Sequence, residues 1–288
     1  VGKYRMNNIK KSLDMILRTI QLNFIKIDHD ISLSFENGMN VAVSKFQGKQ
    51  SILFCDNDLK LIQQNSLIQN LETKIKSMSN HILIPKACEK NFKKVMKHSN
   101  IITYDGYKED IYLADFRPDP TFLKKLPFDN YVVIRPEDSN SFYVNEKTSL
   151  VPELIKKFQK ENINVVYLPR EEEDKRYIQK HNDAFIPQQT FNGLDLAYHA
   201  DAILTGSGTM AREAACMNKP AISFFPSKKL LSVDEKLKNE EKIYHSRNPD
   251  HIVQYVKEKT KTKNNTNLNR SKNVKQEVIN IIQPILTP

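Results

Sequence analysis

The stretch from residue 201 to residue 226 constrains the fold more than any other part of the chain. It holds an apolar run at 202–204, then Thr205, Gly206, Ser207, Gly208 and Thr209, then helix-forming residues at 210–217 and a second apolar run at 221–225. This order predicts a strand, a glycine loop, a helix and another strand. Free N–H groups at the start of such a helix favour an anion, most often a phosphate. A plain turn that needs glycine for positive φ explains the loop equally well.

Glu213 follows the loop by one helical turn. A carboxylate there suits two sugar hydroxyls better than a phosphate, so loop and acid together predict a nucleotide or nucleotide-sugar site. Residues 206–211 also fit G-x-G-x-x-A, but a dinucleotide site requires an acid about 20 residues later, at the end of the next strand. That strand ends in Phe224, Phe225 and Pro226. We therefore interpret the loop as a phosphate site without a dinucleotide partner.

Apolar runs alternate with helical patterns along the whole chain, which predicts two Rossmann-like α/β domains with parallel sheets. Predicted strands lie at 31–35, 51–54, 81–85, 101–104, 131–134, 164–168, 184–187, 202–204, 221–225 and 242–245. A charged helix is expected at 171–181, and the prolines between 118 and 127 mark a boundary. We predict a partial N-terminal domain at 1–117, a linker at 118–128, a C-terminal nucleotide-binding domain at 129–262, and a polar connection with a C-terminal helix at 263–288.

Polar side chains follow several predicted strands, where ligands bind in parallel α/β sheets. In the first half these are Asp56 and Asp58, for which a helix-capping turn is slightly favoured over a catalytic role. In the second half Arg135 and Arg170 are shaped for phosphate contact, and pairing with nearby glutamates such as Glu137 explains them equally well. Asp234 is interpreted either as a first-turn helix carboxylate or as a ligand of a sugar hydroxyl.

The formal net charge of +10 makes polyanions attractive partners, but the lysines are interspersed with glutamates, which favours a solvated surface. No nucleic-acid-binding motif is present, so specific nucleic-acid binding is not predicted, and contact with an anionic membrane rests on charge alone. The three cysteines form no CxxC pair and predict reduced thiols in a cytoplasmic protein. The seven histidines show no metal-ligand spacing, so neither a metal nor another cofactor is predicted.

Longer motifs resemble a known family: YDGYKEDIYL at 104–113, VIRPEDSNSFYV at 133–144, YLPR at 167–170, GSGTMAREAA at 206–215 and FPSKKLLSVDEKL at 225–237. Together they are similar to the DUF354 family, which is uncharacterised, common in archaea and grouped with GT-B folds. Residues 192–225 also resemble the C-terminal domain of UDP-N-acetylglucosamine 2-epimerases and, more distantly, of the N-acetylglucosaminyltransferase of peptidoglycan synthesis.

The resemblance implies a GT-B-like fold whose N-terminal domain is incomplete, because Val1 enters after the expected first strand–helix–strand region. It implies that residues 206–209 hold a diphosphate and that Glu213 holds the nucleotide ribose. Arg135 would approach the phosphates, and the segment 227–234 would lie near the donor sugar, with Lys228, Ser232 and Asp234 as its candidate contacts. The acids and the histidine on which the epimerases rely are not matched individually.

The leading hypothesis is therefore a protein that binds a nucleotide-diphosphate sugar, specifically a glycosyltransferase with a UDP-sugar donor. Asp56 or Asp58 would deprotonate the acceptor hydroxyl. Two alternatives remain open, a UDP-sugar 2-epimerase-like enzyme and a noncatalytic polyanion-binding protein. The acceptor and the oligomeric state are not predicted.

Overall fold

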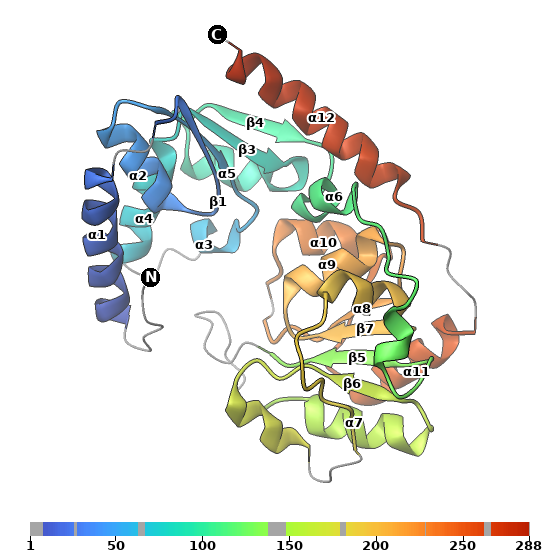
Figure 1. Ribbon diagram of the computed structural model, residues 1–288. Coiled ribbons are helices and arrows are strands. Elements are labelled where there is room, and N and C mark those ends of the chain that lie inside the picture. Colours follow the sequence, from blue (N-terminus) through green and yellow to red (C-terminus); the bar gives the residue numbers. More distant parts are fainter. Residues whose placement is uncertain are drawn as a thin grey trace. The chain divides into compact units, whose positions relative to one another are not determined.

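The chain folds into two units, each built on a parallel sheet (Figure 1). The computed structural model describes residues 8–25, 28–62, 67–137, 148–178, 183–227, 229–261 and 266–287. Unit 1 comprises Val1–Gly106, Leu231–Val233 and Glu277–Pro288, and unit 2 comprises Tyr107–Leu230 and Asp234–Gln276. The predicted α/β class with two parallel sheets is confirmed. The segment 118–128, for which the prolines predict a linker, belongs to unit 2.

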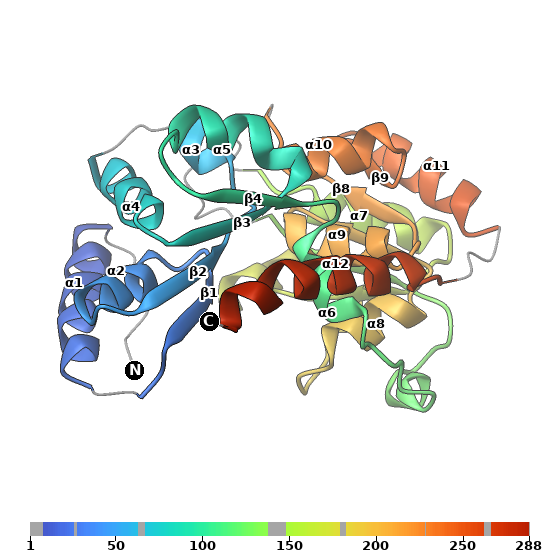
Figure 2. The ribbon, with the colours of Figure 1, turned by 90° about the horizontal axis from the view of Figure 1, so that it is seen from above.

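Unit 1 contains a four-stranded sheet in the order β1-β2-β3-β4, with every pair parallel. The apolar parts of its central strands, 52–54 in β2 and 82–85 in β3, are buried, as expected when both faces are covered. Helix α2 packs against α1, α4, β1 and β2 (Figures 1 and 2). The elements are α1 (Asn8–Phe24), β1 (Ile31–Phe35), α2 (Gly38–Phe46), β2 (Gln50–Phe54), α3 (Leu59–Ile62), α4 (Leu67–Ser77), β3 (His81–Pro85), η1 (Lys86–Cys88), α5 (Glu89–Val95) and β4 (Ile101–Tyr104).

Unit 2 contains a five-stranded parallel sheet in the order β6-β5-β7-β8-β9. Its elements are α6 (Lys108–Leu113), η2 (Phe122–Lys125), β5 (Val132–Arg135), α7 (Val151–Lys160), β6 (Val165–Tyr167), η3 (Glu172–Tyr177), α8 (Gly193–His199), β7 (Ala202–Thr205), α9 (Gly208–Cys216), β8 (Ala221–Ser223), α10 (Ser232–Asn239), β9 (Ile243–His245) and α11 (Pro249–Lys259). Helix α10 begins with two residues of unit 1, and α12 (Asn269–Leu286) continues from unit 2 into unit 1.

The core of unit 2 follows from the two-residue period of its strands. Val132 and Ile134 of β5 join one buried cluster with residues of α7 and α11. Val133, which lies between them, is also fully buried. Helix α9 contacts β7 and β8, and none of its described residues belongs to that cluster, so it covers the other face. The glycine loop that leads into α9 therefore follows a buried central strand, β7.

Short-range signals set several helix limits. Asn192 and Asn248 cap α8 and α11, because each side chain accepts two amide hydrogen bonds from the first turn. Helix α9 ends just before Asn218, which adopts the left-handed conformation with φ of 59°. The predicted stop after residue 217 is thus confirmed.

Two expectations for unit 2 are corrected. Residues 184–187 do not form a strand: only Phe185 pairs with the sheet, through a bridge to Val166. The charged segment expected as a helix at 171–181 is a short 3-10 helix, Glu172–Tyr177, and 179–181 lie outside the described residues. Asp174 starts that helix by accepting the amide of Glu171 at its N-terminus, and the i to i+3 bonds end at Ile178.

Within the part of the chain that the structure describes, a helix with the length and apolar character required to cross a membrane is not found.

Candidate functional site

The glycine loop joins the carboxyl end of β7 to the first turn of α9. Ser207 is the N-cap, with extended backbone at φ −135° and ψ 153°. Its own amide donates to Thr205 Oγ1 at 3.0 Å, and among the described residues its side chain makes no capping hydrogen bond to the helix. The Ser207 side chain therefore leaves the first amides of α9 uncapped in the part of the chain that the structure describes, which is the condition for binding an anion there.

Close packing, and not positive φ, explains both glycines of the loop. Gly48 is the one glycine reported with positive φ in the described chain, so the plain-turn explanation in that form does not apply to Gly206 or Gly208. A Cβ atom added to Gly206 would lie 2.5 Å from Cα and 2.6 Å from the backbone N of Glu137. A Cβ atom added to Gly208 would collide with the guanidinium group of Arg212. The loop is thus held tightly against the end of β5 and over Arg212.

The Gly206→Ala variant is expected to lose about 1–3 kcal/mol of unfolding free energy, because its methyl group meets backbone that cannot move away. Urea titration measures this loss. Gly193→Ala is the matched control, since a Cβ at Gly193 meets nothing within 4 Å. Equal stability of the two variants would show that the loop is not tightly packed.

Arg212 lies beneath the loop and joins three elements. It is 2% exposed, and its Nε and Nη1 atoms donate to Glu109 Oε1 and Asp234 Oδ1, each at 2.9 Å. Its Nη2 atom lies 3.5 Å from Thr209 Oγ1. Asp234, in the first turn of α10, thus has a partner within unit 2. The position of its carboxylate is set by Arg212.

Glu213, one residue further along α9, points to a different neighbour. The hydroxyl of Tyr112 on α6 donates to Glu213 Oε1 at 2.7 Å. Burial raises the pKa of Glu213, while the Tyr112 hydrogen bond and the positive charges of Arg212, Lys108 and Arg135 oppose the rise. The Glu213 carboxylate on α9 therefore lies near several positively charged side chains.

Arg135 is the last residue of β5, and Arg170 follows the adjacent strand β6. Burial and the nearby charge of Arg170 lower the pKa of Arg135 below its ordinary value. Arg170 is fixed by its Nε atom, which donates to Pro136 O at 3.0 Å. Across the described ranges, Arg135 takes part in no ion pair. The negative charge of Glu213 favours the protonated form of Arg135 and so opposes the fall in its pKa. Two neighbouring guanidinium groups of this kind suit a dianionic ligand.

Glu137 is engaged by the chain itself. Its carboxylate accepts hydrogen bonds from Ser149 Oγ at 2.6 Å, from the Leu150 amide at 3.2 Å and from Arg247 Nη1 at 3.2 Å. These bonds tie the end of β5 to the start of α7. A substrate contact for Glu137 stays a prediction, and Lys228 lies outside the described residues.

The two acids predicted as catalytic lie in unit 1, after β2. Asp56 is 4% exposed and Asp58 is 1% exposed. Asp58 accepts the amide and the hydroxyl of Ser232 and the side-chain amide of Asn91, all within unit 1. Asn57 Oδ1 accepts the amide of Lys60. The turn therefore caps helix starts, as the slightly favoured interpretation expects. Its catalytic role stays a prediction.

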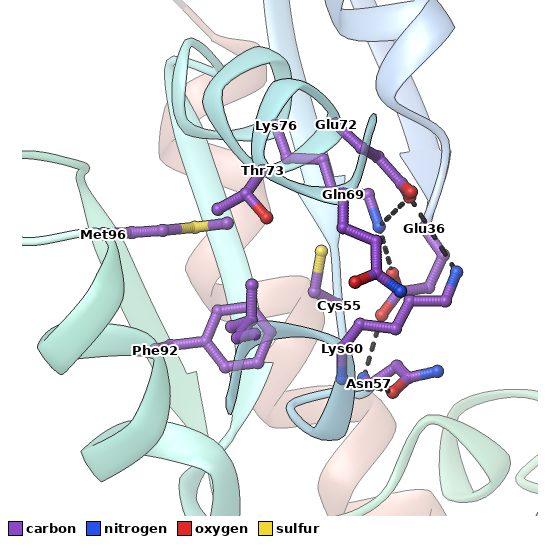
Figure 3. Close-up of a pocket in the computed structure, with 11 residues that line it drawn as sticks. Glu36, Cys55, Asn57, Lys60, Gln69, Glu72, Thr73, Lys76, Phe92 and Met96 are labelled. Carbon is purple, nitrogen blue, oxygen red and sulfur yellow. Dashed lines mark hydrogen bonds and ion pairs between the residues drawn. The ribbon is translucent and has the colours of Figure 1, made fainter. Parts of the chain in front are cut away.

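A second charged cluster in unit 1 surrounds the same turn (Figure 3). Glu36 follows β1 at φ 52°, and its Oε1 accepts the amides of Asp56 and Asn57 at 2.8 and 2.9 Å. Lys76 of α4 is 5% exposed and donates to Glu36 Oε2 at 2.5 Å. It also pairs with Glu72 at 3.0 Å. These contacts fix the position of the Asp56 turn.

Sequence reasoning missed the residues that hold the site. Polar contacts close to the predicted positions come from Arg212, Tyr112, Glu36 and Lys76, and the partners in these contacts are distant in sequence. Only Arg212 had a local signal, since a charged residue within a run of small apolar ones predicts a buried ion pair. No group of three metal-ligating side chains gathers in the described ranges, and the three cysteines are buried and free.

Comparison with known proteins places the chain in a family. The model of the family described as "Protein of unknown function (DUF354)" matches residues 35–283. The chain belongs to the DUF354 family. An uncharacterized protein from Methanocaldococcus jannaschii is 31% identical over 189 residues, which cover 63% of this chain and 55% of that protein. The match thus spans little more than half of that curated relative.

Solved structures with similar folds show what the DUF354 architecture is like. The UDP-GlcNAc 2-epimerase of M. jannaschii has a TM-score of 0.67 at 13% identity, with 98% of this chain and 84% of that chain covered. The same enzyme in complex with UDP-GlcNAc and UDP gives 0.66 at 14% identity, covering 98% and 83%. Sucrose-phosphate synthase of Thermosynechococcus elongatus has a TM-score of 0.58 at 11% identity, with 99% of this chain and 80% of that chain covered. The fold is therefore GT-B-like.

Proposed function

We propose that this DUF354 protein binds a nucleotide-diphosphate sugar and acts as a glycosyltransferase with a UDP-sugar donor. The uncapped start of α9, which follows the close-packed glycine loop, carries the proposal. It offers amide donors and the positive end of a helix dipole to a diphosphate. Structures of fold neighbours that hold UDP or UDP-GlcNAc support the choice of nucleotide.

The charges around the loop are consistent with such a ligand. Arg135 and Arg170 supply positive charge at the ends of two adjacent strands, and Glu213 supplies a carboxylate for ribose hydroxyls. In transfer, the loop amides and Arg135 would stabilise the charge that develops on the departing diphosphate. Arg212 would hold the loop from below, since it contacts Glu109 of α6, Thr209 of α9 and Asp234 of α10.

The acceptor is expected to be deprotonated by a carboxylate of unit 1. Asp56 and Asp58 are the two candidates, and both carboxylate oxygens of Asp58 also accept hydrogen bonds from Ser232. Glu36 and Lys76 would hold the Asp56 backbone in place. Ser232 and Asp234 remain proposed contacts for the donor sugar.

Arg135→Gln is expected to weaken UDP binding by about 10- to 100-fold, since a hydrogen bond to a charged group is worth about 1.5–3 kcal/mol. Isothermal titration calorimetry with UDP and UDP-GlcNAc measures the change. Arg176→Gln is the control, because Arg176 is exposed on η3. Absence of saturable UDP binding by the unmodified protein would refute the proposed function.

A UDP-sugar 2-epimerase-like activity is the second candidate, favoured by the fold neighbours. The two activities separate in one assay. An epimerase converts UDP-GlcNAc without an acceptor, whereas a transferase releases UDP only when an acceptor is supplied. Proton NMR of UDP-GlcNAc incubated with the protein alone distinguishes them.

A further inference from the structure

The Tyr112–Glu213 contact is a polar pair beside the proposed nucleotide site that the sequence analysis did not identify. Tyr112 comes from α6 and Glu213 from α9, two helices that pack together in unit 2. The Tyr112 hydroxyl lies 2.7 Å from Glu213 Oε1, while 42% of the residue remains exposed. The pair therefore lies at the surface of unit 2, where a ligand can reach it.

We propose that Tyr112 is a positioning residue for nucleotide binding, whose hydroxyl keeps the Glu213 carboxylate charged and oriented toward a ribose diol. The inference rests on the proposed function. It adds a specificity-determining partner to the site and limits the ligand to ribonucleotides that present two free hydroxyls.

The hydrogen-bonding capacity of the pair agrees with this role. An ionised carboxylate has about four acceptor positions, and Tyr112 occupies one of them on Oε1. The remaining positions can accept two hydroxyl donors from a ribose. A protonated Glu213 would instead present a donor and fewer acceptors, so it would bind a diol less well.

A donor such as Tyr112 favours the ionised form of Glu213, which burial opposes. Burial raises its pKa, and Tyr112 is the first of the groups that oppose the rise, with Arg212 on its own helix, Lys108 on α6 and Arg135 on β5. Burial and the nearby carboxylates of Glu213 and Glu109 raise the pKa of Tyr112 far above its ordinary value. The phenol therefore stays a donor at neutral pH.

Tyr112→Phe removes one hydroxyl and tests the inference. We expect the affinity for UDP-glucose to fall about five- to tenfold at neutral pH. We also expect the acidic decline in affinity to begin at higher pH than in the unmodified protein, because Glu213 without its donor takes up a proton more readily. Calorimetric titrations at a series of pH values measure both effects. UDP-glucose is suitable because its diphosphate diester does not titrate in this range.

Two further variants make the result specific. Glu213→Gln is expected to abolish the acidic decline, because the amide does not titrate. Tyr255→Phe is the matched control: Tyr255 lies on α11, stacked on Tyr244, and its loss of a hydroxyl should leave the profile unchanged. A Tyr112→Phe profile that is unchanged, or lowered equally at every pH, would overturn the positioning role.

A ligand-free measurement separates this inference from the proposed function. Carbon-13 NMR titration of the glutamate carboxyl groups, assigned with Glu213→Gln, should show a higher pKa for Glu213 in Tyr112→Phe. If the pKa does not rise, the inference is wrong whatever the protein binds. If it rises but the unmodified protein binds no UDP-glucose, the nucleotide function and the ribose role both fail, and the Tyr112–Glu213 coupling alone survives.

Discussion

Replacing Arg212 with methionine is expected to lower the free energy of unfolding by about 3–5 kcal/mol. Arg212 is 2% exposed and donates to Glu109 and Asp234, and Glu109 is itself fully buried. Methionine removes the cation that lies 2.9 Å from the buried Glu109 carboxylate and leaves it with Lys108, whose Nζ atom lies 3.9 Å away. Urea unfolding followed by circular dichroism measures the loss.

The second substitution in this experiment separates charge from packing. Arg212→Met combined with Glu109→Gln should recover part of the lost stability, because the buried negative charge is removed as well. Arg176→Met, at an exposed position of η3, should change stability by less than about 0.5 kcal/mol. A single Arg212→Met variant as stable as the Arg176 control would contradict a structural role for the ion pair.

The order of strands along the chain could be predicted because each buried strand is a short apolar run. Ile52 and Leu53 of β2, or Ile203 and Leu204 of β7, have both neighbours along the strand buried, so composition alone marks them. The segment 184–187 has a similar composition but contributes one bridge at Phe185. Apolar character predicts burial, and pairing depends on backbone geometry that the sequence does not display.

The glycine loop was located from sequence because its signal is local, a strand end followed by a helix start. The reason for its glycines was not, because Glu137 and Arg212 meet the loop only in the folded unit. Tyr112 and Glu213 are separated by 101 positions, and nothing in either segment indicates the other. Contacts of this kind depend on how α6 packs against α9, which a pattern of residue types does not specify.

Replacing Lys76 with methionine is expected to destabilise the protein by about 3–5 kcal/mol at neutral pH. Lys76 is 5% exposed and pairs with Glu36 and Glu72, so its loss leaves two carboxylates close together around the pocket of Figure 3. Lys74→Met on the same helix is the control, because Lys74 is exposed. Urea unfolding of both variants measures the difference.

The pH dependence of this loss follows from the pKa shifts of the two partners. Burial alone would lower the pKa of Lys76, but Glu36 and Glu72 outweigh it and the net shift is upward. The charge of Lys76 therefore contributes fully to the free energy of unfolding below the pKa of an unfolded lysine. This contribution disappears only as the pH rises through the higher pKa of Lys76 in the folded protein. Burial raises the pKa of Glu72, but Lys76 and Lys60 outweigh it, so the net shift is downward. The contribution of the Glu72 charge to the free energy of unfolding therefore disappears as the pH falls through the pKa of Glu72 in the folded protein.

The difference in free energy of unfolding between Lys76→Met and the unmodified protein should thus be largest near neutral pH and small in strong acid and strong alkali. A gap that stays constant from acid to alkali would show that packing of the lysine stem, and not its charge, holds the Asp56 turn.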